Sequence, residues 1–179
     1  MAEPRHADPV LLIIAIFSRH TTALDWAFDR LQEEFGPVAL MSRAYRFDQT
    51  SYYEPSMGAD LRKQFLAFSN LVSADCLPKT KLRTNALEDE LALSGRFRES
   101  RPLNLDPGVL TLGKFLLATI KDQAHRVYLG QGIFAEVTLR FQAGAFEAWP
   151  WTYADYREGH VRAFMKDARE FYRRQIRGG

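Results

Sequence analysis

Eight consecutive apolar residues near the start of the chain constrain the fold most. The run Val10–Phe17 (VLLIIAIF) is flanked by Pro9 and Ser18. A membrane-spanning helix needs about 20 such residues, so this run is too short to cross a bilayer. A short apolar run rich in β-branched residues is typical of a strand buried inside a sheet. The sequence therefore predicts a buried strand and no membrane segment.

Length and composition are those of one globular domain. The chain has 179 residues, of which 46% are hydrophobic and 26% charged, and a chain of this size folds without disulfides or a structural metal. Its net charge of +2 is too small to indicate nucleic acid or anionic lipid as a partner. The lone Cys76 fits a reducing compartment, so we expect a cytoplasmic protein. No repeat or linker interrupts the chain, and we expect a flexible segment over residues 1–8 followed by a single domain over 9–179.

Hydrophobic periodicity predicts the remaining elements. The predicted helices cover residues 21–35, 59–72, 85–93, 107–120 and 159–177, and the further strands cover 38–47, a short stretch from 101, and a hairpin over 127–141. Residues 48–58 form a candidate site loop between them. A strand–helix–strand opening and a hairpin-rich second half indicate an α+β fold. We expect a single domain with a mixed or mainly antiparallel sheet and helices packed mostly on one face.

Three polar positions have structural explanations available. Asp106 and Pro107 suit the first positions of a helix, whose free N–H groups are an alternative site for an anion. Asn85, with Glu88 three residues later, resembles a capping box. Each of these residues therefore has a structural role open to it besides a functional one.

The hairpin over 127–141 carries a second set of polar residues. A three-residue turn would place Arg126 opposite Glu136 on the polar side of the hairpin. An ordinary ion pair on a solvated face and a face that lines a ligand site both remain open. Strand alternation would put His125 on the other side from this pair.

Several segments in one order resemble a family of proteins. They are DQTSYYEPSMG at 48–58, KLRTNALE at 81–88, the stretch RPLNLDPGVLTLGKFLLATIKDQAHRVYLGQGIFAEVTL at 101–139, and PWTYADY at 150–156. Together they resemble the bacterial family of domain of unknown function 4416. The resemblance implies no particular activity, although some members carry a GTP-binding label.

A phosphate loop would support that label, and the sequence argues against one. Residues 108–114 read GVLTLGK, which matches the start of the motif GxxxxGK[ST]. Phe115 then stands where a hydroxyl should hold magnesium, and the intervening residues are apolar at helical spacing. We predict no P-loop, with Gly113 inside a helix.

The leading hypothesis is a pocket for a small polar ligand that is phosphorylated or nucleotide-like. Its candidate residues are polar or aromatic side chains within the family-like segments. The ligand-binding set is Tyr52, Tyr53, Glu54, Lys81, Asn85, Asn104, Lys121, Arg126, Trp151 and Tyr153. Glu136 and Asp106 are the candidate catalytic carboxylates, with Lys81 and Arg126 stabilising negative charge.

Two other classes of function remain open. The aromatic segment 149–156 and the basic helix 159–177 resemble an RNA-binding footprint, although both also suit a docked terminal helix. A protein-interaction domain without catalysis is the other alternative. The four histidines lack the spacing of zinc ligands, so we assign no metal ligands, and the cofactor remains unknown.

Overall fold

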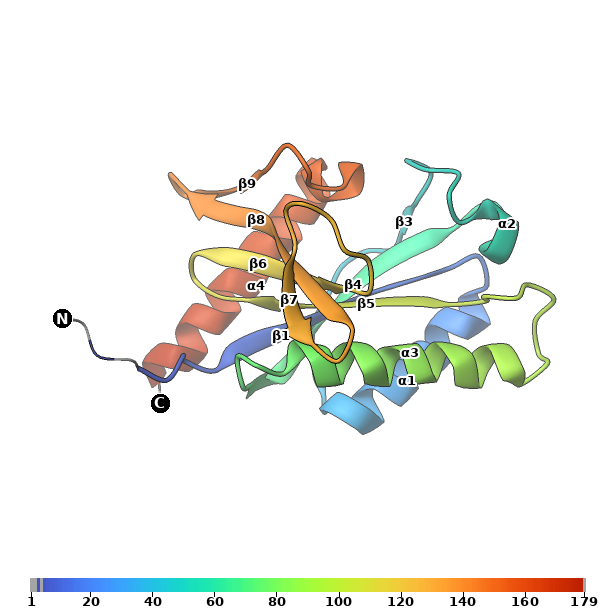
Figure 1. Cartoon of the computed structure of the whole chain (residues 1–179), viewed down its shortest axis with the longest axis horizontal. Coiled ribbons are helices and arrows are strands. Elements are labelled where there is room, and N and C mark those ends of the chain that lie inside the picture. Colours follow the sequence, from blue (N-terminus) through green and yellow to red (C-terminus); the bar gives the residue numbers. More distant parts are fainter. Residues whose placement is uncertain (1–2, 4, 179) are drawn as a thin grey trace.

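A computed structural model describes residues 3 and 5–178. The strands in this part of the chain form one antiparallel sheet of order β2-β4-β1-β5-β6-β8-β7, with β3 beside β4 and β9 beside β8 (Figure 1). The strands are β1 (Val10–Ser18), β2 (Val38–Met41), β3 (Tyr45–Arg46), β4 (Arg62–Val72), β5 (Asn104–Leu110), β6 (Lys114–Thr119), β7 (Val127–Gly130), β8 (Ile133–Gln142) and β9 (Ala145–Ala148). The helices are α1 (Thr21–Phe35), α2 (Glu54–Met57), α3 (Leu77–Leu93), the 3₁₀ helix η1 (Ala154–Arg157) and α4 (Gly159–Gly178). The predicted α+β fold is confirmed.

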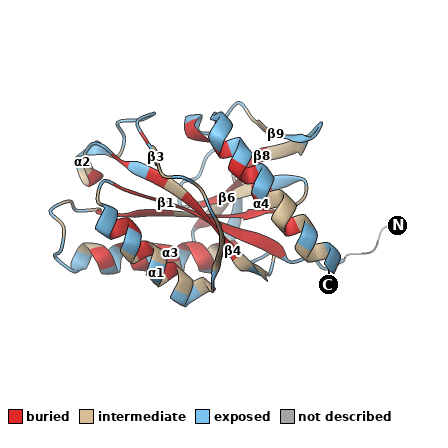
Figure 2. Ribbon diagram, turned by 180° about the vertical axis from the view of Figure 1, so that it is seen from behind, coloured by how far each residue is buried: buried red, intermediate tan, exposed pale blue. Residues whose placement is uncertain are grey.

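Strand β1 lies at the centre of the sheet and separates two apolar cores. All nine of its residues are buried, which confirms the predicted strand (Figure 2). Leu11 and Ile13 pack on the side of α4, and Leu12 and Ile14 pack on the side of α1 and α3. Two of the three long helices thus share one face of the sheet, and the third covers the other (Figure 1).

The first and the last of the long helices, α1 and α4, match their predicted ranges closely. Helix α1 covers the predicted residues 21–35, and α4 buries the predicted apolar stripe against the sheet. The predicted strand over 38–47 is present as the two shorter strands β2 and β3. Of the predicted flexible segment, residues 1, 2 and 4 lie outside the described residues, and residues 3 and 5–8 have no helix or strand.

The helix predicted over 59–72 is wrong, because this segment forms strand β4. Phe65 and Ala67 face the α4 core, whereas Leu66 and Phe68 face the core of α1 and α3. A central strand that is buried on both faces loses the alternation of apolar and polar residues. Its apolar residues then match a helical spacing by coincidence.

The helix predicted over 107–120 is also wrong, because this segment forms the hairpin of β5 and β6. Asp106 therefore caps no helix, and the anion site expected at such a helix start does not exist. Gly113 lies in the turn between the two strands, and Lys114 begins strand β6 rather than a helix. The apolar residues of this segment alternate between two buried faces, which again imitates helical periodicity.

Gly108 explains how closely the two strands of this hairpin approach. A Cβ atom at this position would lie 2.4 Å from the Leu116 carbonyl oxygen and 2.4 Å from the Phe115 ring. We expect Gly108→Ala to lower the free energy of unfolding by about 1–3 kcal/mol, as overpacking does. Denaturant titration measures this loss, with Gly113→Ala as the control, since its Cβ would meet nothing within 4 Å. Equal stabilities of the two variants would contradict the prediction.

Helix α3 begins eight residues before the predicted start. Asn85 and Glu88 lie inside it, so the predicted capping box is wrong. The Glu88 carboxylate instead crosses to strand β5, where its Oε1 accepts a hydrogen bond of 2.7 Å from the Leu105 N–H.

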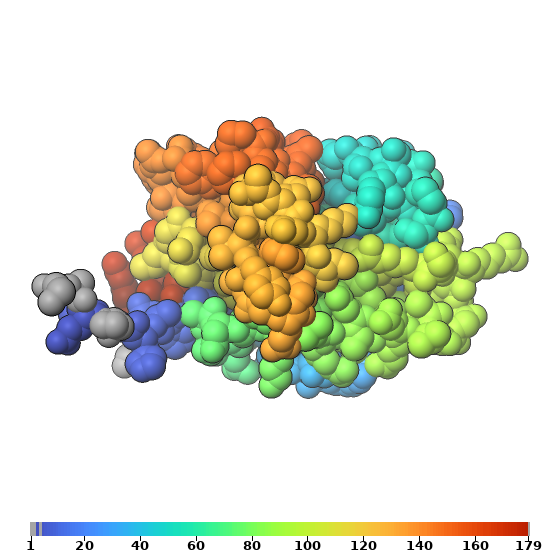
Figure 3. All heavy atoms as spheres, in the orientation of Figure 1, coloured from blue at the N-terminus to red at the C-terminus, as the bar shows by residue number. Residues whose placement is uncertain are grey.

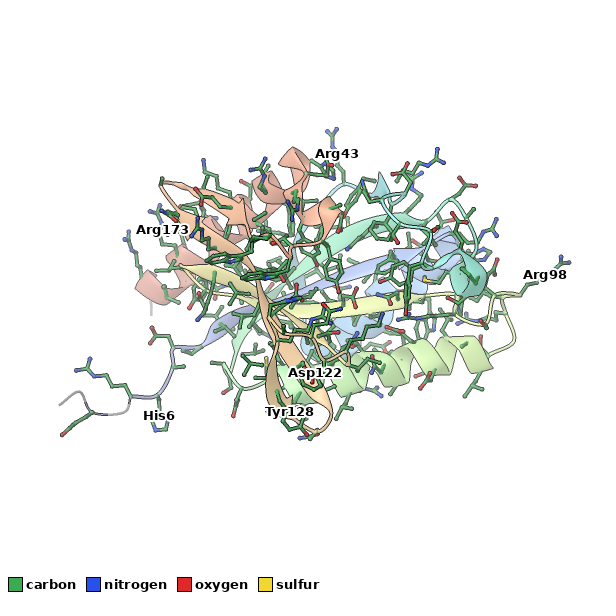
Figure 4. The ribbon with its side chains drawn as sticks, turned by 45° about the horizontal axis from the view of Figure 1, so that its top comes forward. His6, Arg43, Arg98, Asp122, Tyr128 and Arg173 are labelled. Atoms are coloured by element: carbon green, nitrogen blue, oxygen red, sulfur yellow. The ribbon has the colours of Figure 1, made fainter. Side chains whose placement is uncertain are left out.

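The predicted hairpin over 127–141 forms as β7 and β8, but its faces differ from the prediction. Val127 and Leu129 belong to an edge strand and are exposed, and Tyr128 points away from the body of the molecule (Figure 4). Glu136 and Thr138 are buried, because Arg126, His125 and Thr152 pack over this part of β8.

Candidate functional site

The sheet opens between β5 and β6, and the reason is a proline. The Thr111 N–H donates to the carbonyl oxygen of Lys114 in β6. Because the backbone N–H positions of a strand point alternately to its two neighbours, those of residues 109 and 107 also face β6. Pro107 has no N–H to donate. Pairing with β6 accordingly ends at Gly108 and Leu117, whereas β5 stays paired with β1 as far as Asn104.

A cavity of about 440 Å³ lies at this opening. Strands β5 and β6 form its walls, and the loop before α2, helix α3 and helix η1 complete it. Its lining residues are Phe47, Thr50, Tyr52, Tyr53, Lys63, Lys81, Asn85, Arg101, Asn104, Asp106, Leu117, Ala118, Thr119, Ile120, Lys121, Gln123, Tyr153, Asp155 and Tyr156. This set includes eight of the residues predicted from the sequence: Tyr52, Tyr53, Lys81, Asn85, Asn104, Asp106, Lys121 and Tyr153.

Helix α3, which packs on the same face of the sheet as α1, supplies Lys81 to the cavity. Lys81 Nζ donates to the Leu105 carbonyl at 2.8 Å and lies 3.3 Å from Asp106 Oδ1. Burial would raise the pKa of the Asp106 carboxyl, but the charges of Lys81 and Lys63 outweigh burial and hold that pKa below its usual value. Asp106 is therefore a carboxylate at neutral pH, with about a fifth of its side chain exposed.

Lys63 and Asp155 form a buried ion pair that the sequence analysis missed. Lys63 Nζ lies 2.6 Å from Asp155 Oδ2, and the two residues are only 3% and 2% exposed. Four aromatic rings surround the ammonium, with centroids 4.7–5.5 Å from Nζ. The hydroxyl of Tyr45 donates a further hydrogen bond of 3.2 Å to the same carboxylate oxygen. Lys63 lies in the cavity lining because this segment forms strand β4 and not the predicted helix over 59–72.

Arg101, whose side chain is about a third exposed, joins the cavity lining to the buried carboxylate of Glu88 in α3. Its Nη2 donates to Glu88 Oε2 at 2.8 Å and also contacts Asn104 Oδ1. Burial raises the pKa of the Glu88 carboxyl, although Lys81 and Arg101 act in the opposite direction.

Two buried polar atoms of the cavity lining have no hydrogen-bond partner among the residues that the structure describes. They are the Asn104 Nδ2 and the Tyr156 hydroxyl, on residues 2% and 1% exposed. An unpaired buried polar group costs about 1–3 kcal/mol. Both residues belong to the cavity lining, so the acceptor atoms of a bound molecule are candidate partners for these two donors.

Two loops at the cavity, one before α2 and one after β6, meet at the surface of the molecule (Figure 3). Lys121, which follows β6, donates from Nζ to the Tyr52 hydroxyl at 2.8 Å and also lies 4.0 Å from the ring centroid. This hydrogen bond lowers the pKa of the Tyr52 phenol. The half-exposed ring of Tyr153 also lines the cavity.

Glu136 and Arg126 do not line the cavity, but Arg126 contacts two residues that do, Lys121 and Tyr153. Arg126 Nε donates to Glu136 Oε2 at 2.8 Å, and both side chains are almost fully buried. The two remaining nitrogens of Arg126 donate to the Lys121 carbonyl at 2.9 Å and the Tyr153 hydroxyl at 2.8 Å. The predicted pairing is confirmed, and of the two settings left open for it the solvated face is wrong. Glu136 touches no cavity space from which it could act as a catalytic residue.

His125 joins this pair, which corrects the expectation that it points elsewhere. The residue lies in a turn before β7, so strand alternation does not apply to it, and its Nε2 is 3.2 Å from Glu136 Oε2. The other two candidates lie outside the cavity lining: Glu54 begins α2, and Trp151 packs beside His125.

The two tryptophans of the aromatic segment already stack on neighbouring side chains. His125 stacks on Trp151 with centroids 5.3 Å apart, Trp151 stacks on Trp149 at 5.2 Å, and Arg140 covers Trp149 at 4.5 Å. Base stacking on RNA needs an open aromatic face. Trp151 already stacks on two neighbouring rings within the molecule.

In residues 3 and 5–178, no group of three or more His, Cys, Asp or Glu side chains is placed to hold a metal ion. No helix in the same residues is long and apolar enough to span a bilayer.

Comparison with known proteins identifies the family. The model of a family described as domain of unknown function (DUF4416) matches residues 8–172. Comparisons with curated proteins and with solved structures gave no significant match. The matched range includes every residue that lines the cavity. The chain belongs to the DUF4416 family, as its sequence segments predicted.

Proposed function

We propose that the protein is a cytosolic binding protein for a small polar ligand that is phosphorylated or nucleotide-like, and that the cavity between β5 and β6 is its site. The observation that carries the proposal is the convergence of four cationic side chains from four segments: Lys63, Lys81, Arg101 and Lys121. Only two carboxylates, Asp106 and Asp155, share the lining with them. Clustered cations and amide donors are the groups that bind phosphate.

Size and aromatic character support the same proposal. A cavity of about 440 Å³ lies in the range of small-molecule sites, which is roughly 300–1,000 Å³. Tyr52 and Tyr153 place half-exposed rings at the mouth, where the ring or sugar of a ligand would pack. Any general-base role in this cavity falls to Asp106, because Glu136 does not line it and Asp155 is buried against Lys63.

A thermal-shift screen with nucleotides, sugar phosphates and inorganic anions tests this proposal. At 100 times its Kd, a ligand adds about 2.7 kcal/mol of stability, which raises the Tm of a chain this long by roughly 5–10 °C. We expect Lys121→Ala to reduce the rise at equal ligand concentration, because Lys121 is an exposed cation at the mouth. Lys166→Ala, on the exposed side of α4, is the matched control and should keep the full rise.

The screen also separates the alternatives. If no phosphorylated compound raises the Tm, or if Lys121→Ala and Lys166→Ala behave alike, the proposed site is wrong. Affinity for RNA that falls steeply with salt, or a co-purifying protein, would then favour the other two classes of function.

A further inference from the structure

The cavity lining offers both hydrogen-bond donors and a hydrogen-bond acceptor, and this combination restricts the chemistry of a ligand that can bind there. Asn104 Nδ2 and the Tyr156 hydroxyl are buried donors without partners in the described chain. Asp106 is an acceptor with exposed side-chain surface, and the hydrogen bond that it accepts from Lys81 is long, at 3.3 Å. A ligand that carries both donors and acceptors would offer partners to all three residues, and hydroxyl groups supply both functions.

The cations divide into an inner pair and an outer pair. Lys63 and Lys81 are each at most 4% exposed and already contact Asp155 and Asp106. Arg101 and Lys121 keep exposed side-chain surface. A phosphate dianion is strongly hydrated, so the exposed pair can bind it with less desolvation than the inner pair.

We infer that the ligand is a sugar phosphate whose hydroxyl groups lie inward on Asp106, Asn104 and Tyr156, with the phosphate outward near Arg101 and Lys121. This inference rests on the proposed function, since it specifies the ligand class for the same cavity. Carboxylate and amide side chains, together with aromatic rings such as Tyr53, are the groups that recognise sugar hydroxyls and the apolar face of a sugar ring.

Two monophosphates of different chemistry test the inference by calorimetric titration. Ribose 5-phosphate carries hydroxyls, whereas phenyl phosphate carries the same phosphate on an apolar ring. We expect ribose 5-phosphate to bind at least tenfold more tightly, because phenyl phosphate leaves the buried polar groups unpaired. On the unaltered protein, 2-deoxyribose 5-phosphate should bind more weakly than ribose 5-phosphate.

Asp106→Asn provides the sharpest test, because charge and hydrogen bonding predict opposite results. Removing a negative charge from the cavity should leave phenyl phosphate binding unchanged or tighter. Losing the carboxylate acceptor should weaken ribose 5-phosphate binding about tenfold. Asp122→Asn makes the same change in charge on the exposed connection between β6 and β7 (Figure 4), outside the cavity lining, and should alter neither affinity.

Each outcome has one meaning. Equal affinities for the two monophosphates on the unaltered protein, or an Asp106→Asn variant that binds both more tightly, would overturn the sugar assignment while leaving a phosphate site in place. Binding of neither compound, nor of any other phosphorylated compound, would overturn the proposed function itself. If Asp106→Asn fails to fold, the comparison of the ribose and deoxyribose phosphates decides the matter.

Discussion

Replacing Asp155 with alanine is expected to lower the free energy of unfolding by about 3–5 kcal/mol. The substitution leaves the ammonium of Lys63 buried without its carboxylate, and removing one partner of a buried ion pair is strongly destabilising. The surrounding aromatic rings contribute cation–π attraction, but this attraction is weaker than the lost ion pair. Urea denaturation followed by circular dichroism measures the effect.

Two controls isolate the buried charge as the cause. Glu147→Ala breaks the exposed pair with Arg140 and should cost less than about 1 kcal/mol. Adding Lys63→Met to Asp155→Ala removes the unpaired ammonium, and should recover most of the lost stability. A single Asp155→Ala variant that loses no more than Glu147→Ala does would show that the pair is not a major stabilising contact.

Raising the pH above about 10 is expected to unfold the protein steeply. Burial raises the pKa of the phenols of Tyr45, Tyr53 and Tyr156 above the ordinary value of 10.0. In the unfolded chain these phenols lose their protons near that ordinary value, so above it the unfolded state holds fewer protons than the native state. Stability therefore falls as pH rises, by about 1.4 kcal/mol per pH unit for each phenol, or about 4 for the three.

Phenolate absorbance and circular dichroism, recorded together, check this expectation. Tyr52 should ionise while the protein is still folded, because Lys121 lowers the pKa of its phenol. The three buried phenols should ionise only as the helix signal is lost. Tyr52→Phe should reduce the early change in absorbance and leave the unfolding transition in place. Ionisation of the buried phenols in a protein that keeps its helix signal would contradict the prediction.

The parts of the fold that could be predicted are those with a clear solvent-facing side or an uninterrupted apolar run. Helices α1 and α4 each bury one stripe and expose the rest, and β1 is too apolar to be anything but a buried strand. Strands β4 and β5 could not be recognised, because burial on both faces removes the alternation that identifies a strand.

The same limit explains which site residues were missed. Lys81, Asn104 and Asp106 stand out as polar residues in a family-like segment, and they do line the cavity. Lys63 could not be found, since a helix over 59–72 would place it on an outer surface. Glu136 was overestimated as a catalytic candidate, because a sequence does not reveal that Arg126 would stand between it and the cavity.

The interruption at Pro107 also has a mechanical consequence. Only three residue pairs connect β5 to β6, against seven between β1 and β5 and six between β6 and β8. The sheet thus consists of two well-paired halves with a narrow joint between them, and local opening should begin at this joint. A molecule bound across the gap would contact both halves and hold them together. Ligand binding in the cavity should therefore make the whole sheet more rigid.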